Sequence, residues 1–372
     1  MTGENNARSG NSLQGMLLVS LVFFYFLLFA QFGFLEGLGR QFETRQLQTL
    51  MGLMGIGGVA GSALAGFRCF PGSIRVRMAI GFIGCLGTAL GSLSADTVPL
   101  NGLVSLAIGL FLGLLTVSLI GHLQGSFPRK RAGLYCGIGT GTAYALANLP
   151  FLHWLPPEGK ALAAVAACAV GLALLIRIEP RRACIAEPAT AERTSGFATL
   201  AVVVVAFLVL VWSDSAAFRL IQGDEALLSI SWFGTAGLLS IACFHFLGGL
   251  GAGMLVDRGW LMSVLGAAYL GLWLGYGLIL GSIVPPTGAW VYATGVSFYS
   301  TGLVAFPLIS RIRLPVVVQA GWTFAVAGWI GSGMGIGMAD DLSEFPPFAW
   351  LVGGALIATG FLFHRRIRKG AE

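Results

Sequence analysis

The sequence predicts an all-α polytopic membrane protein with about twelve transmembrane helices in two pseudo-symmetric six-helix bundles. The composition favours this fold class, because 56% of the 372 residues are hydrophobic and only 10% are charged, against roughly 25% charged in soluble domains. Successive apolar runs are long enough to cross a bilayer, which takes about 20 residues. Basic residues also alternate in density from one connection to the next, which sets an orientation for the chain.

Twelve apolar segments have the length of a transmembrane helix or come close to it. Glycine is frequent within them: it occupies 55 positions, well above its usual share of roughly 7%, and small residues let membrane helices approach closely. The first segment is a full span without a short apolar core and cleavage site, so we expect no cleavable signal peptide. In chain order the predicted spans are 14–37, 46–67, 78–95, 101–124, 132–152, 160–177, 197–218, 229–255, 261–283, 287–309, 315–337 and 346–363.

The distribution of basic residues predicts a multi-pass protein of the cell inner membrane with cytoplasmic N- and C-termini. Lys and Arg are enriched in the cytoplasmic loops of membrane proteins. With a cytoplasmic start, only four of the 22 basic residues fall on the outer side: Arg40, Arg45, Lys160 and Arg219. The net charge of +6 therefore reflects orientation and does not indicate binding to nucleic acid. A missed span would invert the alternation of basic-rich and basic-poor connections from that point on. The alternation instead continues to the last loop.

One hydrophilic stretch, rich in Arg, Glu, Ala and Pro, divides the chain midway between the sixth and seventh spans. We therefore expect an N-terminal six-helix bundle over 1–177, a cytoplasmic linker over 178–196 and a C-terminal six-helix bundle over 197–372. The six cysteines form no CxxC pair and have no metal-ligand spacing, so neither a disulfide nor a metal site is expected.

The ends of the second and eighth spans have related sequences. Residues 61–68 read GSALAGFR and residues 251–258 read GAGMLVDR, so both are small-residue helix ends that run into a basic turn. In the second of them, Gly253, Asp257 and Arg258 resemble the G-x-L-x-D-R pattern of the major facilitator superfamily.

A further stretch carries the same resemblance. Residues 127–140, FPRKRAGLYCGIGT, are similar to that superfamily's connection between the fourth and fifth helices, where basic residues lead into a Gly-rich helix. The first half departs from the superfamily at Phe67, which stands in place of the motif's Asp. The resemblance implies a 12-helix secondary transporter in which Asp257 and Arg258 belong to a gating motif. The alternative is an ordinary pair of loop residues that follows the orientation rule.

Few ionisable residues fall within the spans, and Asp214 is the leading candidate for the substrate or ion pathway. Such residues are costly in hydrocarbon and mark pathways or internal ion pairs. Asp214 lies about eighteen residues into the seventh span, which places it in the outer half of the bilayer. Trp212 precedes it and Arg219 follows it. We interpret Asp214 as the binding group for a proton, a cation or a basic substrate group; the alternative is a structural ion network.

The first span ends in a related way, with Gln31, then Glu36, then Arg40. Glu36 and Arg40 are four residues apart and can pair on one helix face. The resemblance implies that the first and seventh helices line a central cavity from opposite halves. These three residues are therefore candidates for the same pathway, and the alternative is an ion network near the membrane surface.

Two further residues complete the candidate pathway. His245 lies past the middle of the eighth span, and histidine can relay protons near neutral pH. The alternative for it is a hydrogen bond to a neighbouring helix. Tyr299 lies deep in the tenth span, and a ring with a polar edge suits a solute cavity.

No nucleophile motif, phosphate-binding loop, HExxH or haem motif occurs, so we expect neither an enzyme nor a cofactor. The leading hypothesis is a secondary active transporter that moves a small solute by alternating access, with the proton as the simplest coupling ion. Its expected partners are the lipid bilayer, the solute and protons. The alternative hypothesis is a non-transporting structural subunit of a larger membrane complex, with which the short loops and Phe67 are compatible.

Overall fold

The computed structural model describes residues 2–67, 69, 72–176, 196–232, 234–281 and 285–369. The predicted linker over 178–196 lies outside the described residues except for its last position. Throughout the described ranges the ordered elements are helices, as the composition and the apolar runs predict.

In the first half of the chain, successive helices run between the two ends of the molecule. Tyr25–Gly33 is a π-helical segment inside the first long helix, which runs on without a break. The elements are α1 (Thr2–Phe24), η1 (Tyr25–Gly33), α2 (Phe34–Gln41), α3 (Thr44–Gly66), α4 (Ile74–Gly91), α5 (Val98–Ser126), η2 (Arg129–Arg131), α6 (Ala132–Ala147), α7 (Pro150–His153) and α8 (Pro157–Ile176).

The second half repeats this organisation, with a second π-helical segment at Thr323–Ile330. The elements are α9 (Gly196–Gly223), α10 (Glu225–Ser231), α11 (Gly234–Asp257), α12 (Leu261–Leu280), α13 (Pro285–Ile309), α14 (Val316–Trp322), η3 (Thr323–Ile330), α15 (Gly331–Leu342) and α16 (Pro347–Lys369).

Within the described residues, nine helices are long and apolar enough to cross a membrane. Three further helical segments correspond to the remaining predicted spans. These are the 16-residue α6, the continuous run from α14 to α15, and the shorter apolar part of α16. About twelve membrane helices therefore follow from the structure as from the sequence.

Two predicted spans have different boundaries in the structure. The span predicted over 229–255 is broken, because α10 ends at Ser231 and α11 begins only at Gly234, whose φ of 55° favours glycine. The span predicted over 132–152 ends with α6, and Pro150 then starts the separate short helix α7. Proline has no N–H to donate and restricts the residue before it, so it separates these helices.

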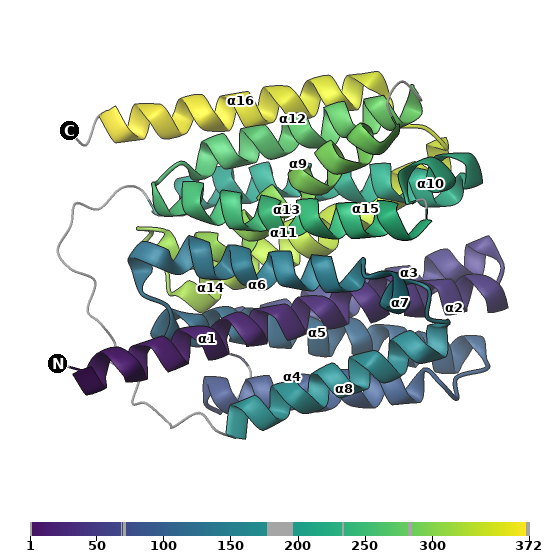
Figure 1. Ribbon diagram of the computed structural model, residues 1–372, viewed down its shortest axis with the longest axis horizontal. Coiled ribbons are helices and arrows are strands. Elements are labelled where there is room, and N and C mark those ends of the chain that lie inside the picture. Colours follow the sequence, from purple (N-terminus) through teal and green to yellow (C-terminus); the bar gives the residue numbers. More distant parts are fainter. Residues whose placement is uncertain are drawn as a thin grey trace.

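The helices form two groups that lie side by side (Figure 1). Helices α1, α4, α5 and α8 lie in one group, and α9, α12, α13 and α16 lie in the other. The start of α1 and the end of α16 lie at the same end of the molecule, on the left of Figure 1, which we call the terminal end. The opposite end, where α2, α7 and α10 lie, is called the far end.

The two groups meet where α6 packs against α11, and glycines make this contact close. A Cβ placed on Gly137 would lie 2.1 Å from the carbonyl oxygen of Gly249, and one on Gly253 would lie 2.4 Å from that of Gly133. Since no side chain separates the helices at these positions, their backbones touch directly. Part of the glycine content of the sequence thus serves close packing at this interface.

Candidate functional site

A polar cluster lies between the two groups of helices, and Asp214 of α9 is its ionisable centre. Tyr292 donates a hydrogen bond of 2.5 Å to Asp214 Oδ1, and Tyr299 donates one to Oδ2. Tyr292 and Tyr299 are buried, whereas Asp214 keeps part of its surface accessible. Each carboxylate oxygen therefore has one phenolic donor.

The geometry of α13 explains why two tyrosines reach one carboxylate. Tyr292 and Tyr299 are seven residues apart, which is close to two helical turns and puts them on one face. Ser297, Ser300 and Thr301 occupy the neighbouring positions and are also buried.

Those hydroxyls connect α13 to the opposite half. Tyr144 of α6 forms a hydrogen bond of 3.0 Å with Ser300, and Thr140 forms one of 3.0 Å with Thr301. The carboxylate of Asp214 thus belongs to one half, and α13 ties its tyrosine partners to α6 of the other.

His245 of α11 joins this cluster without touching Asp214. Its Nδ1 lies 2.8 Å from Ser297 Oγ, and its ring stacks on Tyr144 with centroids 4.7 Å apart. His245 is buried, so both contacts support the alternative of a histidine that is hydrogen-bonded to a neighbouring helix.

At the terminal end, Asp257 links the halves through the start of a helix. Its two oxygens accept hydrogen bonds from the backbone N–H groups of Gly133 (2.7 Å) and Leu134 (2.9 Å), in the first turn of α6. A carboxylate at this position satisfies free N–H donors and interacts favourably with the helix dipole.

The same end holds a second contact of the opposite sign. Arg129 of the first half donates to the carbonyl oxygens of Ile309 (3.0 Å) and Ser310 (2.8 Å), where α13 ends. A cation near a helix C-terminus is favourable. Each half therefore supplies a charged side chain to a helix end of the other.

At the far end, aromatic and polar contacts connect the halves. Phe32 of η1 packs edge-on against Phe218 of α9 with centroids 5.7 Å apart. Trp232 packs against Phe218 at 5.8 Å and donates a 3.3 Å hydrogen bond to Asn148 Oδ1. The cluster around Asp214 thus lies between contacts at both ends.

Arg219 does not act on Asp214. Its Nε lies 2.6 Å from Asp340 Oδ1 on α15, and Gln48 of α3 donates to the other oxygen of Asp340 at 3.4 Å. Arg219 thus pairs across helices, since the spacing of five residues does not bring its side chain beside Asp214 on α9.

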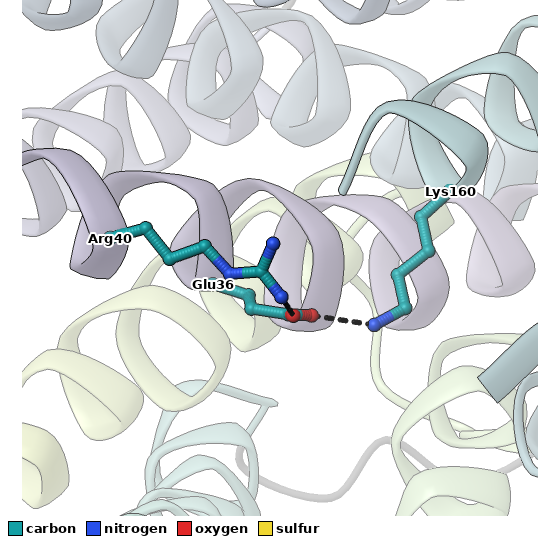
Figure 2. A network of polar contacts seen from close by, with 3 residues as sticks. All are labelled: Glu36, Arg40 and Lys160. Atoms are coloured by element: carbon teal, nitrogen blue, oxygen red, sulfur yellow. Dashed lines mark hydrogen bonds and ion pairs between the residues drawn. The ribbon is translucent and has the colours of Figure 1, made fainter. Parts of the chain in front are cut away.

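The acid at the end of the first span belongs to a separate network of three residues (Figure 2). Glu36 accepts from Arg40 at 2.5 Å and from Lys160 of α8 at 2.7 Å. Lys160 is only 7% exposed, whereas Arg40 is 62% exposed. Gly33 allows this approach, since a Cβ there would lie 2.8 Å from that of Lys160. The network joins two helices of the same half and lies apart from the Asp214 cluster.

Removing the charge of Glu36 is expected to destabilise the protein. In Glu36→Gln the buried ammonium of Lys160 loses its carboxylate, and leaving a buried group without its partner costs about 1–3 kcal/mol of unfolding free energy. Thermal unfolding in detergent measures the loss. Arg40→Gln is the control and should cost less than about 1 kcal/mol, because Arg40 is largely exposed. Equal losses in the two variants would contradict a structural role for the Lys160 contact.

Three other predicted site residues make no polar contact with Asp214 within the described residues. Trp212 packs on Phe345 with ring centroids 5.8 Å apart. Gln31 lies on η1 and makes no hydrogen bond within the described part of the chain. Arg258 is exposed and donates only to the carbonyl oxygen of Met254, at 3.4 Å. Arg258 therefore does not compete with the N–H groups of α6 for the Asp257 carboxylate.

Sequence reasoning missed several residues that complete these contacts. Tyr292 and Tyr144 bind within the Asp214 cluster, and Lys160 and Asp340 pair with the predicted ionisable residues. The seven-residue spacing of Tyr292 and Tyr299 was the available signal, because it places both phenols on one face of a helix.

This architecture is similar to that of solved transporters. FucP, the E. coli fucose:proton symporter, matches in its outward conformation with a TM-score of 0.64 and 15% identity, over 95% of this chain and 98% of that one. The human organic anion transporter MFSD10 matches with a TM-score of 0.67 and 13% identity, over 95% and 97%. The proton:xylose symporter XylE matches with a TM-score of 0.67 and 14% identity, over 97% and 96%. No family model and no curated protein sequence matches the chain.

Proposed function

We propose that this chain, which has the fold of major facilitator superfamily transporters, is a secondary active transporter. It moves a small solute across the inner membrane by alternating access, and Asp214 binds the coupling proton. The observation that carries the proposal is a carboxylate inside a membrane helix, beside the interface of two halves and held by two tyrosines. Ionisable groups in such places mark ion and substrate pathways.

Alternating access requires that the contacts at the two ends open in turn. The terminal end is held by Asp257 and Arg129, and the far end by the rings of Phe32, Phe218 and Trp232. Each of these hydrogen bonds and ring contacts can break without unfolding a helix. The division into bundles over 1–177 and 197–372, with a cytoplasmic linker between, is part of this proposal.

The role of Asp257 in closing the terminal end is tested by Asp257→Asn. The neutral amide loses the charged interaction with the start of α6, so the open form should gain population about 5- to 150-fold, the range of 1–3 kcal/mol couplings. Spin labels at Lys130→Cys and Arg311→Cys, exposed positions in opposite halves, report the separation in a background without native cysteines.

Arg258→Gln is the control for this measurement. Arg258 is exposed and bonds only to its own helix. The distribution of distances between the two spin labels in Arg258→Gln should therefore match that of the parent protein. An unchanged distribution in Asp257→Asn would show that the carboxylate does not hold the halves together.

The proposed function itself is tested by solute-dependent proton movement. Purified protein is first screened with metabolites for thermal stabilisation, since a ligand present at about a hundredfold its dissociation constant adds roughly 2.7 kcal/mol. A stabilising solute is then added to proteoliposomes, and the internal pH is followed. Movement of protons with the solute supports transport, whereas binding without flux would contradict it.

A further inference from the structure

The charge balance around Asp214 indicates which kind of solute this site takes. We infer that the cargo is a monovalent organic cation with an apolar or aromatic body, such as a protonated amine, and that it replaces the proton on Asp214. This inference rests on the proposed transport function and adds to it a substrate class and a mode of coupling.

The first step is the missing counter-ion. Within the described residues, no Lys or Arg side chain acts on Asp214, and its polar partners are the two tyrosines. The nearest such cation along α9, Arg219, is already paired with Asp340. A carboxylate within a membrane helix costs about 2.5 kcal/mol or more without a partner. The cation that neutralises Asp214 therefore comes from outside the protein.

The second step is that the neutral polar groups already have partners. Tyr144 bonds to Ser300, Thr140 to Thr301, and His245 to Ser297. A polyhydroxylated neutral solute needs several polar groups that are free to bind it, because unpaired buried groups are costly. By contrast, each oxygen of Asp214 has one donor, and an ionised carboxylate accepts about four hydrogen bonds in total. The remaining acceptor sites of the Asp214 carboxylate thus favour a positively charged hydrogen-bond donor.

The third step concerns the rings. Tyr144, Tyr292 and Tyr299 bring three aromatic side chains into the cluster. Aromatic faces attract ammonium groups, by about 0.5–2 kcal/mol. An anionic or zwitterionic solute would place its negative group among hydroxyls, with no Lys or Arg of the cluster to pair with it, and His245 is already bonded to Ser297. A single positive charge on an apolar body fits this composition.

Sharing one carboxylate has a consequence for coupling. Three tyrosines face Asp214: Tyr292 and Tyr299 from α13 and Tyr144 from α6. Beyond them lie His245 on α11, Tyr276 on α12 and the Arg219–Asp340 pair. Phenols ionise only near pH 10 in water, so Asp214 is the group that releases its proton when the cargo binds. Either a proton or the cation neutralises the carboxylate, never both. Transport is therefore a one-for-one exchange that moves no net charge.

The test uses benzyltrimethylammonium, a permanent cation, and its neutral isostere neopentylbenzene. Each is added to the purified full-length protein in weakly buffered detergent with a pH indicator. We expect the cation to bind and to displace up to one proton per site. Because the proton and the cation compete for one carboxylate, the apparent dissociation constant for the cation should rise about tenfold for each unit by which the pH is lowered, at low pH. The neutral isostere should release none.

Two variants complete the design. Asp214→Asn should lose both cation binding and proton release, while Asp341→Asn, an exposed acid, should keep both. Binding of the cation without proton release, or no binding of the cation, would overturn the inference. In proteoliposomes, a pH gradient should drive uptake of the labelled cation, and a potassium–valinomycin potential alone should not.

Further outcomes distinguish a wrong substrate class from a wrong function. Proton-coupled uptake of a neutral solute that depends on Asp214 and responds to membrane potential would overturn the cation inference and leave the transporter proposal intact. Proton-coupled flux that persists in Asp214→Asn would contradict the assignment of Asp214 and, with it, both proposals.

Discussion

Asp214→Asn should abolish proton-coupled transport and leave the folded protein intact. Asparagine has nearly the same shape and still accepts a hydrogen bond from Tyr292 or Tyr299, but it neither binds nor releases a proton. Solute-driven proton movement in proteoliposomes should fall to the level of empty vesicles. Stability should be unchanged or higher, because the substitution removes a charge that has no basic partner in the cluster.

The control for this prediction keeps the charge and removes one donor. Tyr299→Phe leaves Asp214 ionisable with its bond to Tyr292, so coupling should weaken and not vanish. Monodisperse elution and thermal unfolding establish that both variants are folded. Full coupled transport in Asp214→Asn would mean that the proton binds elsewhere and that the Asp214 cluster is structural.

Gly57→Ala should strongly destabilise the first half of the protein. A Cβ at this position of α3 would lie 2.1 Å from the carbonyl oxygen of Leu106 and 3.0 Å from the N–H nitrogen of Leu110, both on α5. These are backbone atoms within a helix, so the two helices must separate to admit the methyl group. Overpacking of this kind costs about 1–3 kcal/mol or more, measurable as a lower midpoint of thermal unfolding.

Gly55→Ala is a matched control two residues earlier on the same helix. A Cβ there meets no atom within 4 Å, so the methyl group is accommodated freely. Alanine also has a higher helix propensity than glycine by up to about 1 kcal/mol, so this variant should be as stable as the parent or more stable. Equal destabilisation by both substitutions would show that α3 and α5 are not in the close contact described.

The sequence predicts the fold well because membrane insertion depends on local properties. The length and hydropathy of segments such as 98–126 and 196–223 are readable without knowing their neighbours. Boundaries are less predictable where a break depends on backbone conformation, as at Gly234. Hydropathy continues through that position, so the separation of α10 from α11 leaves no mark in an apolar profile.

The site is less predictable, because its contacts join helices that are distant in the chain. The pair Glu36–Arg40 follows from a spacing of four residues on one helix. Asp214 and Tyr292 are 78 positions apart, and their meeting depends on how α9 and α13 are rotated about their axes. Asp257 likewise binds backbone groups of α6, which every sequence possesses. Composition and spacing identify the ionisable residues but not the partners they select.

The glycine contact between α6 and α11 has a consequence for the speed of conformational change. Interlocked side chains must change rotamer whenever two helices shift, and each such change adds to the activation barrier. At Gly137, Gly249 and Gly253 there are no rotamers to change, so the two backbones can pivot as smooth surfaces. In the proposed transport cycle, the charged and aromatic contacts at the two ends then contribute more to the barrier than this interface does, and substitutions there should change the turnover rate while the interior stays as it is.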